Sequence, residues 1–355
     1  MQKTSLLFLL LMLLLAVAAC EKNATSEKEK AFYKAVDISS FPEIESHGTR
    51  FYNLNGKEKP FTDILKNHGV NTIRLKLWVQ PENPVSGLEE VAGFAARLKG
   101  QGFKIWLTVH YSNTWADPGN QQTPAAWQDL ELEALKDSVY EYTRQVVNRI
   151  QPEIIQIGNE VNNGFLHPMG NIHDYPNQFI ALVQEGIHAT RQHQPDTKIM
   201  IHYAGMQGSN RFFAEVSGLD YDLIGISYYP VWHGKNPDSL KQTLSQLSKT
   251  YQKDILIAET AYPFTLGWND WTNNIVGLEE QLILPEYPAS PEGQKAFLQK
   301  IRNLVEETPH GAGFCYWGAE RIAFKGPEAT DGSGWENQAL FNFSNQALPA
   351  LKVFE

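Results

Sequence analysis

Short hydrophobic runs alternate with longer amphipathic segments along the chain from residue 32 to its end. The short runs are rich in β-branched and aromatic residues, which is typical of buried strands. There are eight of them, at residues 32–39, 71–79, 102–111, 153–160, 197–205, 221–230, 254–263 and 311–320. In the segments between them, apolar residues recur every three or four positions. This spacing predicts helices over residues 60–68, 88–99, 132–150, 175–193, 211–217, 237–251 and 291–307.

Eight strands alternating with helices predict an α/β fold, a single (β/α)₈ TIM barrel over residues 32–355. An open doubly wound sheet is the alternative, and it would carry a glycine-rich phosphate-binding turn after its first strand. Residues 37–46 read DISSFPEIES and contain no glycine. The barrel is therefore favoured.

The first thirty residues predict export. Lys3 precedes an apolar run at residues 6–15, and small residues then lead to Cys20. This is the anatomy of a secretory signal, and it resembles the lipobox of bacterial lipoproteins. The resemblance implies a signal peptide at residues 1–19, then a lipidated Cys20 and a charged tether up to residue 31. We expect a secreted, membrane-anchored lipoprotein at the outer membrane or cell surface. The alternative is a plain signal peptide in which Cys20 is incidental.

Composition narrows the range of partners. The chain of 355 residues has a formal net charge of -10, which argues against nucleic acid. Nine Trp and fourteen Tyr either fill the core or, where they gather in loops, offer flat apolar surfaces to sugar rings. Cys315 lies in the apolar run GFCYW and is expected in the core, so we predict no intrachain disulfide.

Polar and aromatic residues end every predicted strand, and the C-terminal ends of barrel strands are where active sites lie. Glu160 ends the fourth strand and Glu259 the seventh. Glycoside hydrolysis needs two carboxylates, about 5–5.5 Å apart for retention and about 6.5–9.5 Å apart for inversion. Arg74, if it reaches Glu259, would keep that carboxylate ionised. Glu160 follows the neutral Asn159 and suits the acid.

Metal ligation finds little support in the sequence. No HExxH or paired-ligand spacing is present, so zinc is not expected, and His110 is interpreted as a polar contact in the site. The stretch WNDWTNN at residues 268–274 clusters oxygen ligands but lacks the frame of a calcium-binding hand. Asp270, Asn273 and Asn274 are therefore interpreted as turn residues.

Several motifs together resemble those of the endo-β-1,4-galactanases of glycoside hydrolase family 53, from about residue 32 to the C-terminus. They include VHYSNTWADPG at residues 109–119, GNEVNNG at residues 158–164 and IAETAYP at residues 257–263. The resemblance implies that Glu160 is the acid/base and Glu259 the nucleophile. It also implies a substrate groove that contains Asp37, Arg74, Trp78, His110, Trp115, Asn159, Tyr203, Tyr228, Trp232 and Trp317.

The resemblance gives some of these residues specific roles. Asn159 would contact the sugar 2-hydroxyl, and Arg74 and Tyr228 would support the nucleophile. Bacterial members of the family often bind calcium in the loop after the seventh strand through Asp, Asn and His ligands. Here that loop, residues 265–290, has no histidine, so no metal or other cofactor is expected. The sequence YWGAE at residues 316–320 replaces the commoner YWEP, so contacts from residues 318–320 are not carried over.

The predicted function is retaining endo-hydrolysis of β-1,4-galactan, as found in type I arabinogalactan or in the galactan side chains of pectin, to galacto-oligosaccharides by a two-glutamate mechanism. One alternative keeps the mechanism and changes the glycan to mannan, β-glucan or xylan, because fold does not imply function. Another alternative is a non-catalytic lipoprotein that captures glycans for a neighbouring enzyme. Such a protein would typically lack one carboxylate, whereas both are present here.

Overall fold

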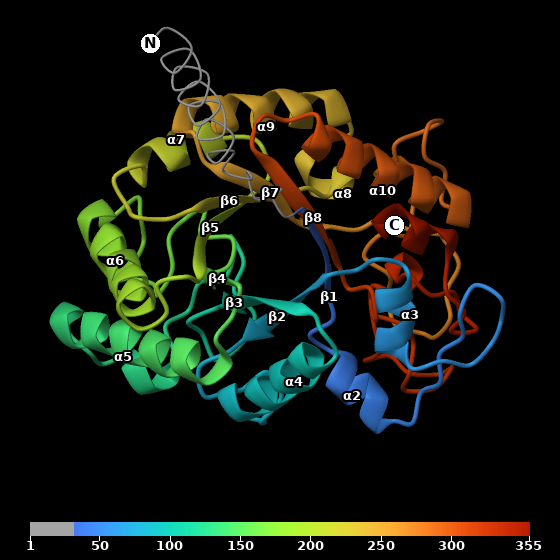
Figure 1. Ribbon diagram of the computed structural model, residues 1–355, viewed down its shortest axis with the longest axis horizontal. Helices are drawn as coiled ribbons and strands as arrows, with labels where there is room; N and C mark the ends of the chain where they lie inside the picture. Colours follow the sequence, from blue (N-terminus) through green and yellow to red (C-terminus); the bar gives the residue numbers. More distant parts are fainter. Residues whose placement is uncertain (1–31) are drawn as a thin grey trace, which may run out of the picture. The chain divides into compact units, whose positions relative to one another are not determined.

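Eight parallel strands form a closed barrel in the computed structural model, which describes residues 32–355 (Figure 1). They are β1 (Tyr33–Asp37), β2 (Thr72–Leu77), β3 (Lys104–Val109), β4 (Ile154–Ile157), β5 (Lys198–Ala204), β6 (Leu223–Ser227), β7 (Asp254–Thr260) and β8 (Gly311–Trp317). Each strand pairs with the next along the chain, and β1 closes the ring against β8 with Asp37 opposite Trp317. The predicted (β/α)₈ barrel is confirmed.

Helices surround the barrel and cover the outer faces of its strands (Figure 1). The longer ones match the predicted segments: α3 (Phe61–Asn67), α4 (Leu88–Gly100), α5 (Leu132–Ile150), α6 (Pro176–His193), α7 (Ser209–Glu215), α9 (Pro237–Tyr251) and α10 (Pro291–Glu306). Two short helices were not predicted, α2 (Phe41–Ser46) and α8 (Pro230–His233). Each has a proline in its first turn and is too short to show a helical repeat of apolar residues.

The barrel interior is filled by side chains at alternate strand positions. A buried cluster contains Tyr33, Ala35, Trp106, Ile154, Met200, Leu223, Leu256, Ala258, Ala312 and Cys315. Cys315 has no exposed surface, as predicted. Gly225 makes room for the large side chains, because a Cβ there would lie 2.6 Å from Met200 Sδ. This packing fills the interior and leaves polar chemistry to the ends of the strands.

A bulge in β7 brings two consecutive residues to the inside of the barrel. Ile226 pairs with Ile257, but the next residue of β6, Ser227, pairs with Glu259, so Ala258 is the extra residue. Ala258 belongs to the interior cluster, and Glu259 lines the cavity above it. A bulge can redirect a side chain in this way next to an active site.

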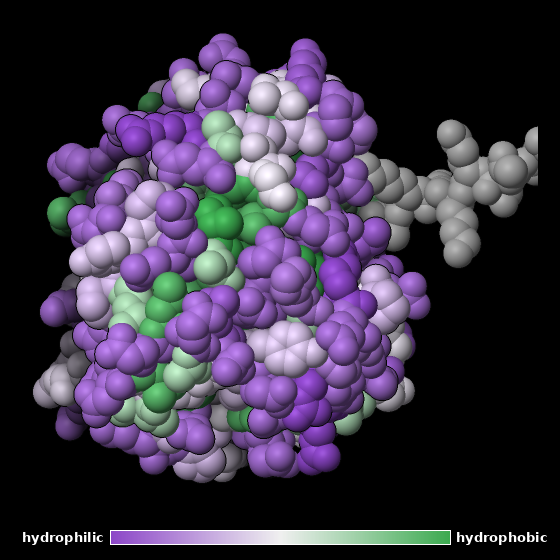
Figure 2. Space-filling view, turned by 90° about the vertical axis from the view of Figure 1, so that its left-hand side faces the viewer, coloured by the Kyte–Doolittle hydropathy of each residue, from purple (hydrophilic) through white to green (hydrophobic). Residues whose placement is uncertain are grey.

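Residues 33–355 form one compact unit. The predicted signal peptide, lipidated Cys20 and charged tether lie outside the described residues. Among residues 32–355, no helix is both long and apolar enough to cross a membrane. Hydrophilic side chains cover most of the face shown in Figure 2, and hydrophobic ones are confined to narrow bands between them.

Candidate active site

A cavity of about 400 Å³ opens at the C-terminal ends of the barrel strands. Its walls include nine of the residues predicted from the sequence: Asp37, Arg74, His110, Trp115, Asn159, Glu160, Trp232, Glu259 and Trp317. These residues come from strands and loops that are far apart in the sequence. The barrel brings them together, as the positions of the strand ends predicted.

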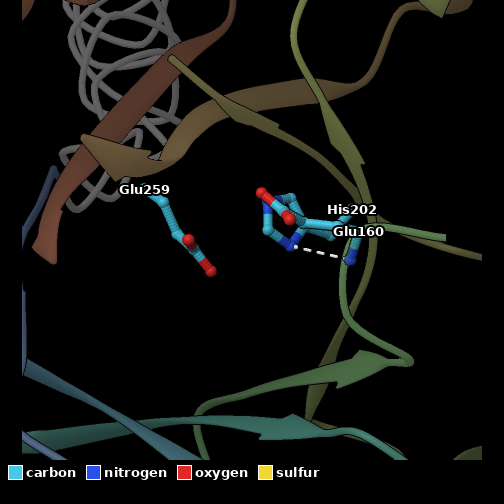
Figure 3. A group of neighbouring side chains, drawn as sticks. All are labelled: Glu160, His202 and Glu259. Carbon is cyan, nitrogen blue, oxygen red and sulfur yellow. Dashed lines mark hydrogen bonds between the residues drawn. The ribbon is translucent and has the colours of Figure 1, made fainter. Parts of the chain in front are cut away.

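The two glutamates lie on opposite sides of this cavity (Figure 3). Glu160 is 8% exposed and Glu259 is 7% exposed. An oxygen of one carboxylate lies within 4.8 Å of an oxygen of the other. The two carboxyl groups can therefore contact one small bound group from two sides.

Glu259 is held by a cation and a hydroxyl. Arg74 Nη2 lies 2.7 Å from Glu259 Oε1, and the Tyr229 hydroxyl donates a hydrogen bond of 3.0 Å to Oε2. Burial raises the pKa of Glu259, but the Arg74 guanidinium and the Tyr229 hydroxyl both oppose this rise. Both oxygens thus have partners that favour the ionised carboxylate.

Arg74 organises the floor of the site from β2. Its Nη1 lies 2.8 Å from Asp37 Oδ2, and its Nη2 also donates to Asn159 Oδ1 over 2.9 Å. Its Nε donates to Gln156 Oε1 over 3.0 Å. Arg74 is 1% exposed, and its single positive charge is shared by the carboxylates of Asp37 and Glu259. A fork of fixed donors therefore sets the relative positions of the residues around it.

Glu160 has a different environment. Ser227 Oγ donates to Glu160 Oε1 over 2.5 Å, and no cation bonds this carboxyl among the described residues. Burial, followed by the nearby Glu259 carboxylate, raises the pKa of Glu160 to about 8. Glu160 also has a left-handed backbone, with φ 47°, which is uncommon for a residue other than glycine and is found at strained functional positions. At neutral pH it holds its proton, as a general acid must.

His202 lies beside Glu160 and makes a trio with the two glutamates whose potential ligand atoms all lie within 4.8 Å of one another (Figure 3). The trio does not fit a metal ion, because both nitrogens of His202 have other partners. Its Nε2 lies 2.8 Å from Ser227 Oγ, and its Nδ1 lies 3.0 Å from the Gln156 amide nitrogen. The imidazole therefore has no free lone pair for a cation.

Three predicted substrate-binding residues do not line the cavity. The Tyr228 hydroxyl donates to the Gly234 carbonyl over 2.8 Å, and the Tyr203 hydroxyl donates to the Gln207 carbonyl over 2.6 Å. Each tyrosine is adjacent in sequence to residues that face the inside of the barrel. Because successive side chains of a strand point to opposite faces, both tyrosines point outward. Trp78 packs edge-on behind Trp115, with ring centroids 5.5 Å apart. The prediction for these three residues is corrected accordingly.

Some residues of the site were missed. Tyr229, not Tyr228, bonds the Glu259 carboxylate. Lys76 also lines the cavity, and its ammonium lies 4.4 Å from the ring centroid of Trp115. Trp335, in the loop after β8, lies 4.5 Å from Trp317 between ring centroids. The inward parity of the strands could have identified Tyr229 and Lys76, whereas nothing in the local sequence marks Trp335.

The aromatic residues form a continuous wall. Successive ring centroids along Trp115, Trp317, Trp335 and Trp232 lie 6.0, 4.5 and 6.1 Å apart, and all four residues line the cavity. Trp232 is 55% exposed at the outer end of this wall. Flat apolar rings beside buried carboxylates suit the faces of sugar rings.

The loops after β7 and β8 meet through buried oxygens, and Asp270 Oδ2 among them has no hydrogen-bond donor. The Asn274 side chain hydrogen-bonds the Glu336 carboxyl nearby. Asp270 lies near enough to contribute to the raised pKa of Glu336, of which burial is the main cause. A Cβ on Gly332 would lie 2.2 Å from Asp270 Oδ2, so glycine leaves that oxygen open. Carboxylate and amide oxygens are the ligands that calcium prefers. These residues fit a hard cation, although the sequence, lacking a histidine there, argued against one.

A closed (β/α)₈ barrel whose mouth holds two buried, facing glutamates beside an aromatic wall has the arrangement of a glycoside hydrolase. The model of glycosyl hydrolase family 53 matches residues 33–354, and the chain belongs to this family. The family predicted from the sequence motifs is thus confirmed.

Similar proteins cover nearly the whole chain. The solved Ignisphaera aggregans GH53 catalytic domain is 37% identical, with a TM-score of 0.87, over 94% of this chain and 98% of that one. The arabinogalactan endo-β-1,4-galactanase of Cellvibrio japonicus is 33% identical over 91% of this chain and 90% of its own length. A probable arabinogalactan endo-β-1,4-galactanase A of Neosartorya fischeri is 33% identical over 97% and 98%.

Proposed function

We propose that this glycoside hydrolase is an endo-β-1,4-galactanase that retains the anomeric configuration, with Glu259 as nucleophile and Glu160 as acid/base. The carrying observation is the Glu160–Glu259 pair, whose nearest potential ligand oxygens lie within 4.8 Å. Retaining enzymes hold their carboxyl groups about 5–5.5 Å apart, whereas inverting enzymes need about 6.5–9.5 Å to admit a water molecule. The observed approach supports direct attack by a carboxylate.

The unequal environments of the two glutamates support the two roles. Glu259, bonded by Arg74 and Tyr229, attacks the anomeric carbon as an ionised carboxylate. Glu160 protonates the departing glycosidic oxygen. In the second step, Glu160 takes a proton from water, which attacks the same carbon and releases Glu259. Asn159 is held by Arg74 at the cavity wall, where its amide can meet a sugar hydroxyl.

The galactan assignment is supported by the names of the relatives, which include arabinogalactan endo-β-1,4-galactanases from a bacterium and a fungus. The aromatic wall also suits a neutral sugar polymer, because stacking on aromatic rings needs no charge on the ligand. Another β-glycan as substrate, or glycan capture without cleavage, would use the same wall. The complete and differentiated carboxylate pair favours cleavage over capture.

A product assay tests the substrate and the stereochemistry together. We expect the purified protein to cut linear β-1,4-galactan into short oligosaccharides whose new reducing ends first appear in the β configuration by ¹H NMR. Release of α anomers first would contradict retention. Cleavage of mannan, β-glucan or xylan instead would contradict the substrate, and binding without new reducing ends would favour the capture protein.

Azide rescue tests the separate roles of the two glutamates. With an activated aryl β-galactoside and azide, Glu259→Ala should form α-galactosyl azide, because azide attacks in place of the missing nucleophile. Glu160→Ala should form β-galactosyl azide, because azide then attacks the covalent intermediate left by Glu259. If Glu259→Ala gave the β-azide and Glu160→Ala the α-azide, the two roles would be reversed. If both variants stayed active without azide, neither residue would take part in the reaction.

We also propose that the protein is exported and anchored through lipid on Cys20. The support is the sequence of residues 1–20 alone, with its apolar run and small residues before the cysteine. In a Gram-negative host, metabolic labelling with a fatty-acid probe should mark the wild type and not Cys20→Ala. The Cys20→Ala variant should also be lost from the membrane fraction. Equal labelling of the wild type and the variant would contradict lipidation at Cys20.

A further inference from the structure

A chain of hydrogen bonds crosses three neighbouring strands and ends on Glu160. Gln156 of β4 bonds His202 Nδ1 of β5 over 3.0 Å, and His202 Nε2 bonds Ser227 Oγ of β6 over 2.8 Å. Ser227 Oγ then bonds Glu160 Oε1 over 2.5 Å. The side chains of Gln156, His202 and Ser227 are all fully buried. Because each member has few partners, the direction of every bond can be worked out.

The Gln156 amide has one possible orientation. Its Oε1 accepts from Arg74 Nε over 3.0 Å, from Trp106 Nε1 over 2.7 Å and from Thr108 Oγ1 over 3.0 Å. Guanidinium and indole nitrogens only donate, so the atom they meet must be the amide oxygen. The other atom is therefore the NH₂ group, and it donates to His202.

The His202 tautomer follows from its neighbours. Nδ1 faces two donors, the Gln156 NH₂ and the Glu160 backbone N–H at 3.4 Å. The one acceptor near it, Asn159 Oδ1 at 3.2 Å, is already bonded by Arg74. Burial and the positive charge of Arg74 hold the pKa of His202 well below its usual value, so the ring is neutral. Nδ1 is therefore the acceptor, and the ring proton is on Nε2.

The Ser227 hydroxyl receives that Nε2–H, so its own proton has Glu160 Oε1 as its acceptor. We propose that Gln156, His202 and Ser227 are positioning residues that fix Ser227 as a permanent donor to Glu160 Oε1, so that the proton transferred in catalysis is carried by Oε2. The inference rests on the proposed acid/base role of Glu160. It assigns one oxygen of the carboxyl to catalysis and the other to support.

The proton count of the reaction is simple under this assignment. In the first step, the proton on Oε2 moves to the glycosidic oxygen, and the carboxylate keeps its bond from Ser227. In the second step, a water molecule attacks and its proton returns to Oε2. The protons of Ser227 and His202 stay where they are, so the chain orients Glu160 without relaying a charge.

Other charged or titratable groups also act on this pair. Those acting on Glu160 are Glu259 of β7, Arg74 of β2 and Asp117 of the loop after β3, and those acting on His202 are Arg74, His110 and His233. The Ser227→Ala substitution removes none of these groups. A change in the titration of Glu160 in such a variant therefore reports the loss of the donor.

Carboxyl ¹³C NMR of the labelled protein tests the donor without any substrate, and Glu160→Gln identifies the resonance. A donor to a carboxylate lowers its pKa, so Ser227→Ala should move the titration of Glu160 up by about 1–2 pH units. Ser248→Ala is the matched control, because this buried serine bonds the Pro309 carbonyl on the outer layer. An unchanged titration in Ser227→Ala would overturn the proposal.

Two further measurements keep the test decisive. If Ser227→Ala fails to fold, Ser227→Cys keeps the volume with a weak donor and must move the titration in the same direction. Imidazole ¹⁵N NMR of the wild type must show the His202 proton on Nε2, and a proton on Nδ1 would overturn the assignment. An upward NMR shift with no cleavage of galactan would leave the positioning chain intact and contradict only the proposed function.

Discussion

Arg74 Nη2 lies 2.7 Å from Glu259 Oε1, and both side chains are almost completely buried. The second nitrogen of the same guanidinium lies 2.8 Å from Asp37 Oδ2. One cation from β2 therefore joins carboxylates from β1 and β7 across the mouth of the barrel. Arg74 therefore contributes to both stability and catalysis, because the ion pair that compensates the buried charges also holds the proposed nucleophile in position.

Arg74→Met should damage both properties. Removing one partner of a buried ion pair leaves a charge without compensation and costs about 3–5 kcal/mol of unfolding free energy. Activity should fall at least about 100-fold, because Glu259 would lose the cation that favours its ionised form. Urea denaturation and galactan cleavage measure the two effects. Arg144→Met is the control, because its pair with Glu141 on α5 is exposed and should leave both nearly unchanged. Equal behaviour of the two variants would contradict this account of Arg74.

The adjacent tyrosines 228 and 229 offer a sharper comparison. Tyr229→Phe removes the hydroxyl that donates to Glu259 Oε2, and kcat should fall about 100-fold, the lower end of the range for losing one donor in an active site. Tyr228→Phe removes a hydroxyl that bonds the Gly234 carbonyl outside the cavity, so kcat should stay within about twofold. Steady-state kinetics on galactan decide. A larger loss in Tyr228→Phe would restore the role that the sequence motifs suggested for it.

The fold was predictable because the hydrophobic pattern repeats. Eight apolar runs separated by amphipathic segments leave few arrangements, and the absence of a glycine-rich turn removed the main competitor. The short helices α2 and α8 were missed because four to six residues carry no periodic signal. Trp335 was missed because the long loop after β8 returns to the cavity through tertiary packing, which no local pattern encodes.

The site was predicted from the strand ends and the family motifs, and strand parity shows where that prediction succeeded and failed. On β6, Leu223 belongs to the interior cluster and Ser227 bonds Glu160, so parity points to Tyr229. The family motif instead suggested Tyr228, and the structure contradicts it. On β7, parity from Ala258 would turn Glu259 outward, and only the bulge brings it into the cavity. A pattern read from residue types could find the glutamate, but not the backbone irregularity that aims it.

The stability of Glu160→Gln should depend on pH. Burial raises the pKa of Glu160 to about 8 from an ordinary value of 4.5. Between these values the folded protein keeps a proton that the unfolded chain releases, so this group lowers stability progressively as pH rises from 4.5 to 8. Glutamine removes that cost. We expect thermal melts to show an advantage for Glu160→Gln that is larger at pH 8 than at pH 5.

The same proton sets a limit on activity. Because Glu160 must be protonated in the free enzyme, kcat/KM of the wild type should fall above about pH 8. A pH–rate profile that stays flat to pH 9.5, or a Glu160→Gln variant whose advantage shrinks as pH rises, would contradict the raised pKa.

The buried oxygens between the loops after β7 and β8 lead us to predict calcium binding, which the sequence alone did not. Asp270 Oδ2 is buried without a donor near the Glu336 carboxyl, a costly arrangement that a bound cation would relieve. Calcium at one hundred times its Kd should stabilise the fold by about 2.7 kcal/mol. The measurement is the rise in Tm when calcium is added to protein that has first been treated with a chelator. Asp270→Asn should abolish the rise, while Asp137→Asn on the exposed face of α5 should preserve it. A Tm that is the same in calcium and in chelator would show that these oxygens are tolerated without a cation, as the missing histidine suggested.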